Sequence, residues 1–348
     1  MLAAVLHGQT DLRLETVPDP TPEPGEVVIQ VDVATTCGTD LKVWRRGGHA
    51  KMLKPPTLFG HEAAGQIVAM GSGVQGWSLG NRVVANNSAP CGHCFFCQRQ
   101  EYSLCTDLTF NNGTFAQYLR IPAAIVEQNL LPIPEHLSMA DASLTEPLAC
   151  VLHGIARSGF KPEQKDGPAQ RVVVIGDGAI GLMFVGVLAH RGAEVILFGG
   201  SEQRLQLGRK LGAVHTYNHH HTDISATTLE LTDNQGADIV IEATGVPSVW
   251  ETAITCGRPG ATINLFGGCP RDTSITVNTD LLHYSELTLK GVFHNTPTFV
   301  RESLALLASQ ELPFEELLND TQPLNHLGQV FADMRDRKTI KAVILPHT

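Results

Sequence analysis

The sequence predicts an α/β protein with two parts: a doubly wound parallel sheet with helices on both faces, and a smaller unit made mostly of strands. Three observations support this fold class. Residues 172–175 are four β-branched apolar residues in a row, as in a strand that is buried on both faces. From residue 170 onward, strand and helix patterns alternate, which is typical of a parallel sheet. Up to residue 85, by contrast, short strand patterns are separated by glycine- and proline-rich turns.

The predicted elements follow in chain order. Residues 18–25 contain four prolines and cannot be helical, so they connect two strands. The triplet His219-His220-His221 could bind a metal, but we expect a solvated loop there. The expected strands are 12–15, 26–33, 64–70, 82–85, 171–175, 194–198, 238–242, 261–266, 287–292 and 342–345, and the expected helices are 179–190, 202–211 and 299–309.

Length and composition limit the class of protein. The 348 residues are enough for two domains of ordinary size, and 43% hydrophobic residues indicate a globular chain. A net charge of −10 argues against a nucleic-acid binder, which needs a basic face. The apolar run 172–189 contains Asp177 and several glycines, so it fits a strand, turn and helix better than a membrane span. Residues 1–6 are too short for a signal peptide and lack a basic start, so we expect a soluble, cytoplasmic protein.

A glycine-rich turn follows the first strand of the second part. Gly176 lets the strand turn sharply, Gly178 lets a pyrophosphate approach the backbone, and Gly181 lets the next helix pack close to the strand. Ala179 and Ile180 begin that helix, whose free N–H groups point at the phosphate. The turn therefore predicts a dinucleotide cofactor.

The end of the next strand bears on which dinucleotide is bound. Enzymes that use NAD usually carry an acidic residue there, whereas this strand ends in Gly199-Gly200-Ser201. Ser201 offers a hydroxyl and backbone N–H groups, and Arg204 can bind phosphate oxygens two at a time. We expect Gly199, Ser201 and Arg204 to bind NADP(H) rather than NAD(H). The alternative is that Arg204 is a surface residue and that Glu202 contacts the ribose of NAD.

Four of the eight cysteines lie within fifteen residues: Cys91, Cys94, Cys97 and Cys105. A long chain without an export signal favours metal binding over disulfides. Four thiolates complete a tetrahedral Zn²⁺ shell and leave no open position, so this site would be structural. An iron–sulfur cluster and a redox pair are the alternatives.

A second metal site is suggested by residues far apart in the sequence. Cys37 and His61 can both ligate a metal, and the hydroxyl of Thr39 follows Cys37 by two residues. Glu146 lies in an otherwise apolar run, where a carboxylate needs a partner such as a metal.

These motifs resemble those of one family. The segment Gly60-His-Glu-Ala-Ala-Gly65 with Gly71 and Val74, the four-cysteine segment, the glycine turn and residues 236–245 occur in the order typical of the zinc-containing medium-chain dehydrogenases. The chain is most similar to their polyol (sorbitol-type) and threonine dehydrogenase branch. The resemblance covers essentially the whole chain. It implies a GroES-like catalytic domain of residues 1–148 and 296–348, with a zinc lobe at about 86–110, and a Rossmann domain of residues 149–295.

The resemblance also implies roles for single residues. Cys37, His61 and Glu146 would surround a catalytic zinc, and Glu62 would be an adjustable ligand or a group just outside the ligand set. Cys150, four residues after Glu146, is the competing ligand. Thr39 would pass a proton outward. Family members often continue this relay with a histidine where this chain has Lys42. With Arg45 and Arg46, Lys42 indicates either an acidic or phosphate-bearing substrate or a solvated basic turn.

The expected function is the reversible oxidation of a secondary alcohol of a polyol, sugar or cyclitol to a ketone. It would use two zinc ions per chain, one catalytic and one structural, and a nicotinamide cofactor. Oxidation of an amino alcohol, as in threonine dehydrogenase, is an alternative. A zinc-stabilised nucleotide-binding protein without catalysis is another. We expect small-molecule alcohol and ketone substrates, no nucleic-acid or membrane partner, and a homo-oligomer (dimer or tetramer) in which residues 261–268 could pair edge to edge.

Overall fold

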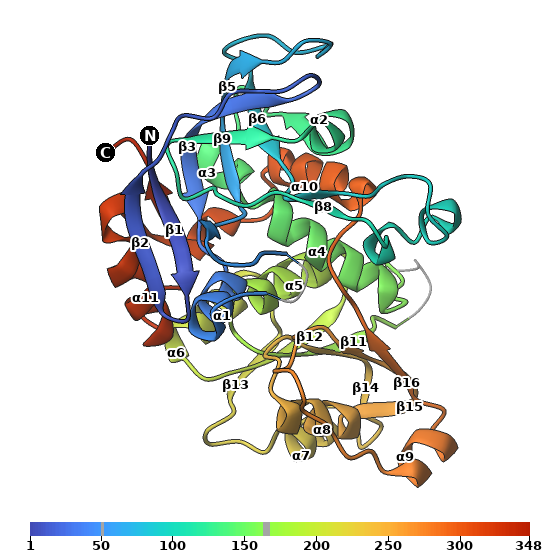
Figure 1. Cartoon of the computed structure of the whole chain (residues 1–348). Coiled ribbons are helices and arrows are strands. Elements are labelled where there is room, and N and C mark those ends of the chain that lie inside the picture. The colour runs from blue at the N-terminus through green and yellow to red at the C-terminus, as the bar shows by residue number, and fades with distance from the viewer. Residues whose placement is uncertain (50–51, 163–167) are drawn as a thin grey trace. The chain divides into compact units, whose positions relative to one another are not determined.

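The computed structural model describes residues 1–49, 52–162 and 168–348 (Figure 1). The chain divides into two compact units. Unit 1 consists of Met1–Ala149 and Asn295–Thr348, and unit 2 consists of Cys150–His294. Across the described ranges, no helix combines the length and the apolar character that a membrane crossing requires.

Unit 1 is built around mostly antiparallel sheets. Its strands are β1 (Leu2–Gly8), β2 (Asp11–Thr16), β3 (Val27–Thr35), β4 (Thr57–Leu58), β5 (Ala63–Met70), β6 (Arg82–Ala85), β7 (Ser88–Ala89), β8 (Thr109–Phe110), β9 (Tyr118–Ile121), β10 (Leu130–Pro132), β17 (Leu318–Pro323) and β18 (Lys341–Leu345). The largest sheet has the order β10-β6-β5-β3-β18-β17, and β9 also pairs with β3. The C-terminal strand β18 therefore completes a sheet that begins near the N-terminus, which makes unit 1 discontinuous in sequence.

Helices close the core of unit 1. They are α1 (Gly38–Arg46), α2 (Ala123–Asn129), α3 (Met139–Ala142), α10 (Pro297–Ser309), α11 (Leu327–Arg335) and the short 3-10 turns η1 (Cys97–Arg99), η2 (Tyr102–Leu104), η3 (Phe314–Leu317) and η4 (Leu324–His326). Phe331 of α11 packs against Phe59 and Phe115, with ring centroids 5.9 and 6.2 Å apart. All three rings are fully buried, so the C-terminal segment contributes to the same hydrophobic core as the N-terminal strands.

Unit 2 is a six-stranded parallel sheet with connecting helices. The strands are β11 (Arg171–Ile175), β12 (Glu194–Gly199), β13 (His215–Asn218), β14 (Ala237–Glu242), β15 (Gly257–Leu265) and β16 (Thr288–Gly291). The helices are α5 (Ala179–His190), α6 (Glu202–Lys210), α7 (Ile224–Leu231), α8 (Pro247–Thr255) and α9 (Thr279–Tyr284), and α4 (Thr145–Arg157) crosses the border between the units. The strand order β13-β12-β11-β14-β15-β16 is the 3-2-1-4-5-6 order of a dinucleotide-binding sheet. The predicted doubly wound sheet is thus confirmed, and the labels β11 to β16 can be followed in Figure 1.

Four local expectations have clear outcomes. The helix predicted at residues 179–190 is α5, and His219, His220 and His221 lie in an exposed turn as expected. The segment with Lys42, Arg45 and Arg46 is helix α1 and not a turn. Residues 261–265 lie in β15, between β14 and β16, so they cannot pair edge to edge with another chain. The edge strand on this side is β16.

Candidate metal and cofactor sites

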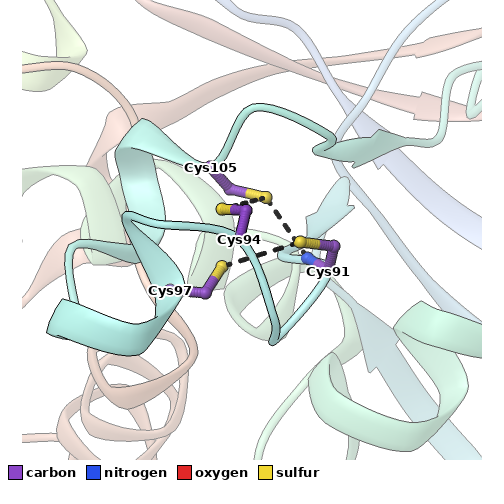
Figure 2. Close-up of side chains that lie close together, drawn as sticks. All are labelled: Cys91, Cys94, Cys97 and Cys105. Atoms are coloured by element: carbon purple, nitrogen blue, oxygen red, sulfur yellow. Dashed lines mark hydrogen bonds between the residues drawn. The ribbon is translucent and has the colours of Figure 1, made fainter.

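The four cysteines of the segment 91–105 form one cluster. Figure 2 shows their sulfur atoms pointing toward one another. The Sγ atoms of Cys91 and Cys97 are 3.9 Å apart, as are those of Cys94 and Cys105, and all four lie within 4.8 Å of one another. Zn–S bonds of about 2.3 Å place the corners of a tetrahedron about 3.8 Å apart. The observed spacing therefore fits a four-thiolate zinc site.

Backbone N–H groups around this cluster donate hydrogen bonds to its sulfur atoms and so favour thiolates. The N–H groups of Cys91 and Asp107 donate to the sulfur of Cys105 at 3.3 and 3.4 Å. Hydrogen bonds from the backbone of Cys97 and Thr106 lower the pKa of Cys94 to about 5. Burial, reinforced by the neighbouring Cys94 thiol, raises the pKa of Cys97 to about 12. The pKa values of Cys94 and Cys97 are thus shifted in opposite directions. A metal that binds all four sulfurs would replace the thiol protons, so that both cysteines would be bound as thiolates.

A second group of possible ligands lies at the start of α1. Cys37 is the N-cap of this helix, and its sulfur accepts a hydrogen bond from the N–H of Thr39 at 3.4 Å. Asp40, at the third position of the helix, completes a capping box by accepting a hydrogen bond from the N–H of Cys37 at 2.9 Å. The helix end therefore fixes the position of the Cys37 sulfur.

The carboxylate of Asp40 also contacts His61, the second possible ligand. Oδ1 of Asp40 lies 2.9 Å from Nδ1 of His61, and both side chains are buried. Burial lowers the pKa of His61, but the Asp40 charge and the Cys37 sulfur more than offset this effect and hold the pKa well above its usual value. A carboxylate on one ring nitrogen is the arrangement that orients a metal-binding histidine through the other nitrogen. Gly60, which precedes His61, has φ +91°, and an added Cβ would lie 2.4 Å from Oγ1 of Thr114, so only glycine fits this turn.

Glu62 completes this group. Its Oε2 accepts hydrogen bonds from Oγ1 of Thr35 at 2.6 Å and from Nζ of the buried Lys341. Its Oε1 is buried and has no hydrogen-bond partner within residues 1–49, 52–162 and 168–348. The ligand atoms of Cys37, His61 and Glu62 lie within 4.8 Å of one another. A sulfur, a nitrogen and an orphaned carboxylate oxygen in one place fit a zinc site that retains an open position.

Glu146 is not one of this group. It lies in the first turn of α4, is buried, and its Oε1 accepts a long hydrogen bond of 3.5 Å from Nδ2 of Asn295. Asn295 is in turn hydrogen-bonded to Asn86 at 3.2 Å. Cys150 follows Glu146 by one turn of the same helix. Glu146 as third zinc ligand therefore stays a prediction.

The glycine turn of unit 2 joins β11 to α5. Gly178 is the N-cap of α5, so the N–H groups of Ala179 and Ile180 belong to the first turn, where no intrahelical carbonyl accepts them. An added Cβ on Gly181 would lie 1.9 Å from the carbonyl oxygen of Gly176, so this helix can approach its strand only with glycine at 181. These are the features that a bound pyrophosphate requires.

At the end of β12, Arg204 is buried in the first turn of α6, whereas Glu202 is exposed and forms an ion pair with Arg209 at 3.2 Å. The backbone of Ser201 differs from the sequence-based expectation. We expected its N–H group to be available to a phosphate, but it donates to Oδ2 of Asp177 at 2.8 Å. The fold thus brings a carboxylate to a strand end whose own residues carry none.

The sequence did not lead us to predict the contacts of three buried side chains. Asp40 could have been found, because an acid three residues after an N-cap is a capping-box signal. Lys341 is 279 positions away from its partner Glu62, and nothing in its local sequence indicates that contact. Asp177 reaches a segment 23 residues further on, for which the glycine pattern gives no signal.

Candidate metal ligands in one unit and a glycine-rich dinucleotide turn in the other are the combination that metal-dependent dehydrogenases use, and this is the class of protein that the fold and the candidate sites indicate. Comparisons with known proteins agree. The family model of the alcohol dehydrogenase GroES-like domain matches residues 23–135, and that of the zinc-binding dehydrogenases matches residues 179–309.

Individual relatives are similar over nearly the whole chain. Sorbitol dehydrogenase of Bacillus subtilis (strain 168) is 30% identical, over 93% of this chain and 90% of that protein. L-threonine 3-dehydrogenase of Pyrococcus abyssi is also 30% identical, over 96% of this chain and 94% of that protein. A solved zinc-binding dehydrogenase of Sinorhizobium meliloti 1021, bound to NADP, superposes with a TM-score of 0.89 at 26% identity and covers 99% of each chain.

The chain belongs to the zinc-containing medium-chain dehydrogenase family, in its polyol and threonine dehydrogenase branch. It is a zinc-dependent alcohol dehydrogenase in the broad sense of that family. This sets aside the alternative of a nucleotide-binding protein without catalysis. The predicted GroES-like and Rossmann fold class is confirmed.

Proposed function

We propose that this enzyme oxidises a secondary alcohol of a polyol, sugar or cyclitol to a ketone and transfers the hydride to a nicotinamide cofactor. The observation that carries the proposal is the cluster of Cys37, His61 and Glu62, in which one carboxylate oxygen has no hydrogen-bond partner among the residues that the structure describes. A purely structural zinc would need four protein ligands, whereas this group leaves room for a substrate oxygen. We carry Glu146 forward as the third protein ligand, with Glu62 as the adjustable neighbour.

The residues of unit 1 have distinct tasks in this reaction. When bound, Zn²⁺ supplies a Lewis acid that lowers the pKa of a coordinated hydroxyl group. Asp40 holds His61 and the backbone of Cys37, so that both ligands keep their positions during turnover. Thr39, half-buried beside Cys37, accepts the hydroxyl proton and passes it toward solvent. Lys42 lies one turn further along the same face of α1, at the position where family members often carry the histidine of this relay.

The structural zinc belongs to the segment 91–105. We propose that Cys91, Cys94, Cys97 and Cys105 bind it, which gives two zinc ions per chain. Phe95 and Leu104 of this segment are 59% and 47% exposed, so little apolar surface is buried to hold the segment in place. The metal would then supply most of its stability.

The cofactor proposed for unit 2 is NADP(H). The residues that end β12 carry no acid, and Arg204 lies in the first turn of the helix that follows. A guanidinium at this position can bind a 2′-phosphate. The pyrophosphate is assigned to Gly176, Gly178, Ala179, Ile180 and Gly181, and the adenosine ribose to the turn of Gly199 and Ser201.

The decisive experiment is an activity screen of the zinc-loaded protein. Polyols, cyclitols, sugars and L-threonine are offered with NAD⁺ and with NADP⁺, and reduced cofactor is followed at 340 nm. Oxidation of one or more polyols, sugars or cyclitols supports the proposal. Oxidation of threonine alone would favour the amino-alcohol reaction, for which Lys42, Arg45 and Arg46 offer cationic partners to a carboxylate. The Cys37→Ser variant lacks a proposed zinc ligand and should be inactive, so it is the matched control for contaminating activity.

The oligomeric state stays a prediction. We expect a homodimer or homotetramer, and light scattering coupled to size-exclusion chromatography measures it directly. A mass of 37.5 kDa at micromolar concentration would contradict this expectation, because it is the mass of one chain.

A further inference from the structure

Asp177 joins two strands of the unit 2 sheet at their carboxyl ends. It lies in the turn after β11, and β11 pairs in parallel with β12, with Ile175 opposite Phe198. Its Oδ2 accepts hydrogen bonds from the N–H groups of Gly200 and Ser201, both at 2.8 Å. The residue is only 6% exposed. A buried carboxylate thus occupies the two backbone donors that follow β12.

The space beside Gly199 is filled by the same side chain. A Cβ added to Gly199 would lie 2.6 Å from Cβ of Asp177 and 2.7 Å from its Oδ2. In NAD-binding sheets an acidic residue at the end of this strand reaches the adenosine ribose. In this chain, glycine at position 199 makes room for a carboxylate that comes from the preceding turn. Asp177 therefore places a carboxylate at the end of β12, whose own residues carry no acid.

A 2′-phosphate would need the same donors. The N–H groups at the start of a helix are the usual partners of a phosphate, and those of Gly200 and Ser201 directly precede α6. Arg204, 9% exposed in the first turn of α6, favours a phosphate at this end of the strand. Asp177 opposes it in two ways, because its carboxylate already uses the donors and repels a second anion.

We infer that Asp177 is a specificity-determining residue for the cofactor: its carboxylate competes with the 2′-phosphate of NADP(H) and reduces the preference for NADP(H) over NAD(H). The inference rests on the proposed function, in which unit 2 binds the cofactor at this turn. NADP(H) binds only when Asp177 gives up its hydrogen bonds to Gly200 and Ser201. NAD(H), which carries a hydroxyl at this place, leaves those bonds intact.

The test measures the affinity of both cofactors for the full-length, zinc-loaded protein. NAD⁺ and NADP⁺ are titrated by calorimetry into the wild type, Asp177→Asn and Asp177→Ala. The asparagine variant keeps the size and one acceptor oxygen but removes the charge. Asp223→Asn is the matched control, because Asp223 also accepts a backbone hydrogen bond, from Ala226 at 2.8 Å, but at the start of α7.

The expected result is a rise of about tenfold in the affinity for NADP⁺ in both Asp177 variants, with a change below about threefold for NAD⁺. The control should leave both affinities unchanged. If the ratio of the two affinities is the same in wild type and Asp177→Asn, the inference is wrong, while the cofactor function stands. If the wild type binds neither dinucleotide, both proposals fail. Should Asp177→Ala not fold, the asparagine variant alone decides.

Discussion

Replacing Cys94 with serine should remove one zinc ion per chain and destabilise unit 1. The sulfur of Cys94 lies 3.9 Å from that of Cys105, in a group whose spacing matches a zinc tetrahedron. Serine is a poor substitute, because its hydroxyl does not ionise at neutral pH and its oxygen lies closer to the backbone than the sulfur does. We therefore expect the remaining three sulfurs to lose the metal.

The size of the effect follows from the length of the segment that the metal closes. Residues 91–105 form a loop of about fifteen residues, and closing such a loop by a covalent cross-link stabilises a protein by about 3 kcal/mol. For a unit of about 200 residues, each kcal/mol shifts the midpoint of thermal unfolding by about 2–4 °C. The variant should thus melt about 6–12 °C below the wild type, since the exposed Phe95 and Leu104 offer little compensating burial.

Two measurements check this prediction. Zinc content is measured by mass spectrometry of the metal, with an expected fall from two to one per chain, and thermal unfolding is followed by circular dichroism. Cys269→Ser, which removes a half-buried thiol outside the cluster, is the control and should keep both ions. Two zinc ions and an unchanged melting temperature in Cys94→Ser would refute the assignment of a zinc site to these cysteines.

Three further predictions concern other residues. Glu146→Ala should reduce turnover and the content of catalytic zinc but leave dinucleotide affinity unchanged; if Cys150→Ala empties the site and Glu146→Ala does not, then Cys150 is the third ligand. Asp40→Asn should weaken zinc binding at the catalytic site by about 10- to 100-fold, because it removes the charge that orients His61, and competition with a chelator measures this. Burial raises the pKa of Glu242 against the opposing hydrogen bonds of its neighbours, so the folded state binds its proton more tightly than the unfolded state does. Unfolding experiments between pH 4 and 7 should therefore show the wild type losing stability relative to Glu242→Gln as the pH rises through the raised pKa, and parallel curves would contradict this reasoning.

Local patterns in the sequence predicted the parts of this protein that depend on neighbouring residues. The run at 172–175 predicted β11, and the helix expected at 179–190 is α5 residue for residue, because a buried strand, a glycine turn and a helix start are each set by a few consecutive side chains. The four cysteines of the segment 91–105 were recognised for the same reason. They lie close together in the sequence, and in the structure their sulfurs are within 4.8 Å of one another.

Helix α1 shows where local reasoning fails. Its N-cap is Cys37, which is not among the usual capping residues, so the segment with Lys42 was not predicted as a helix. The capping box with Asp40 was the signal that would have revealed it. Because Asp40 also contacts His61, a prediction of this helix start would also have identified the residue that contacts two candidate zinc ligands.

Local sequence patterns were enough to predict the fold class, the family motifs and the chemical nature of the candidate ligands. The partners of these groups depend on contacts that form only in the folded chain. Lys341 reaches Glu62 because β18 adds to a sheet begun near the N-terminus, and Asp177 reaches Gly200 because β11 and β12 end side by side. A buried charge must find a partner, but the chain can supply it from any distance in sequence. Strand order and register select that partner, and neither can be predicted from the residues next to the charge.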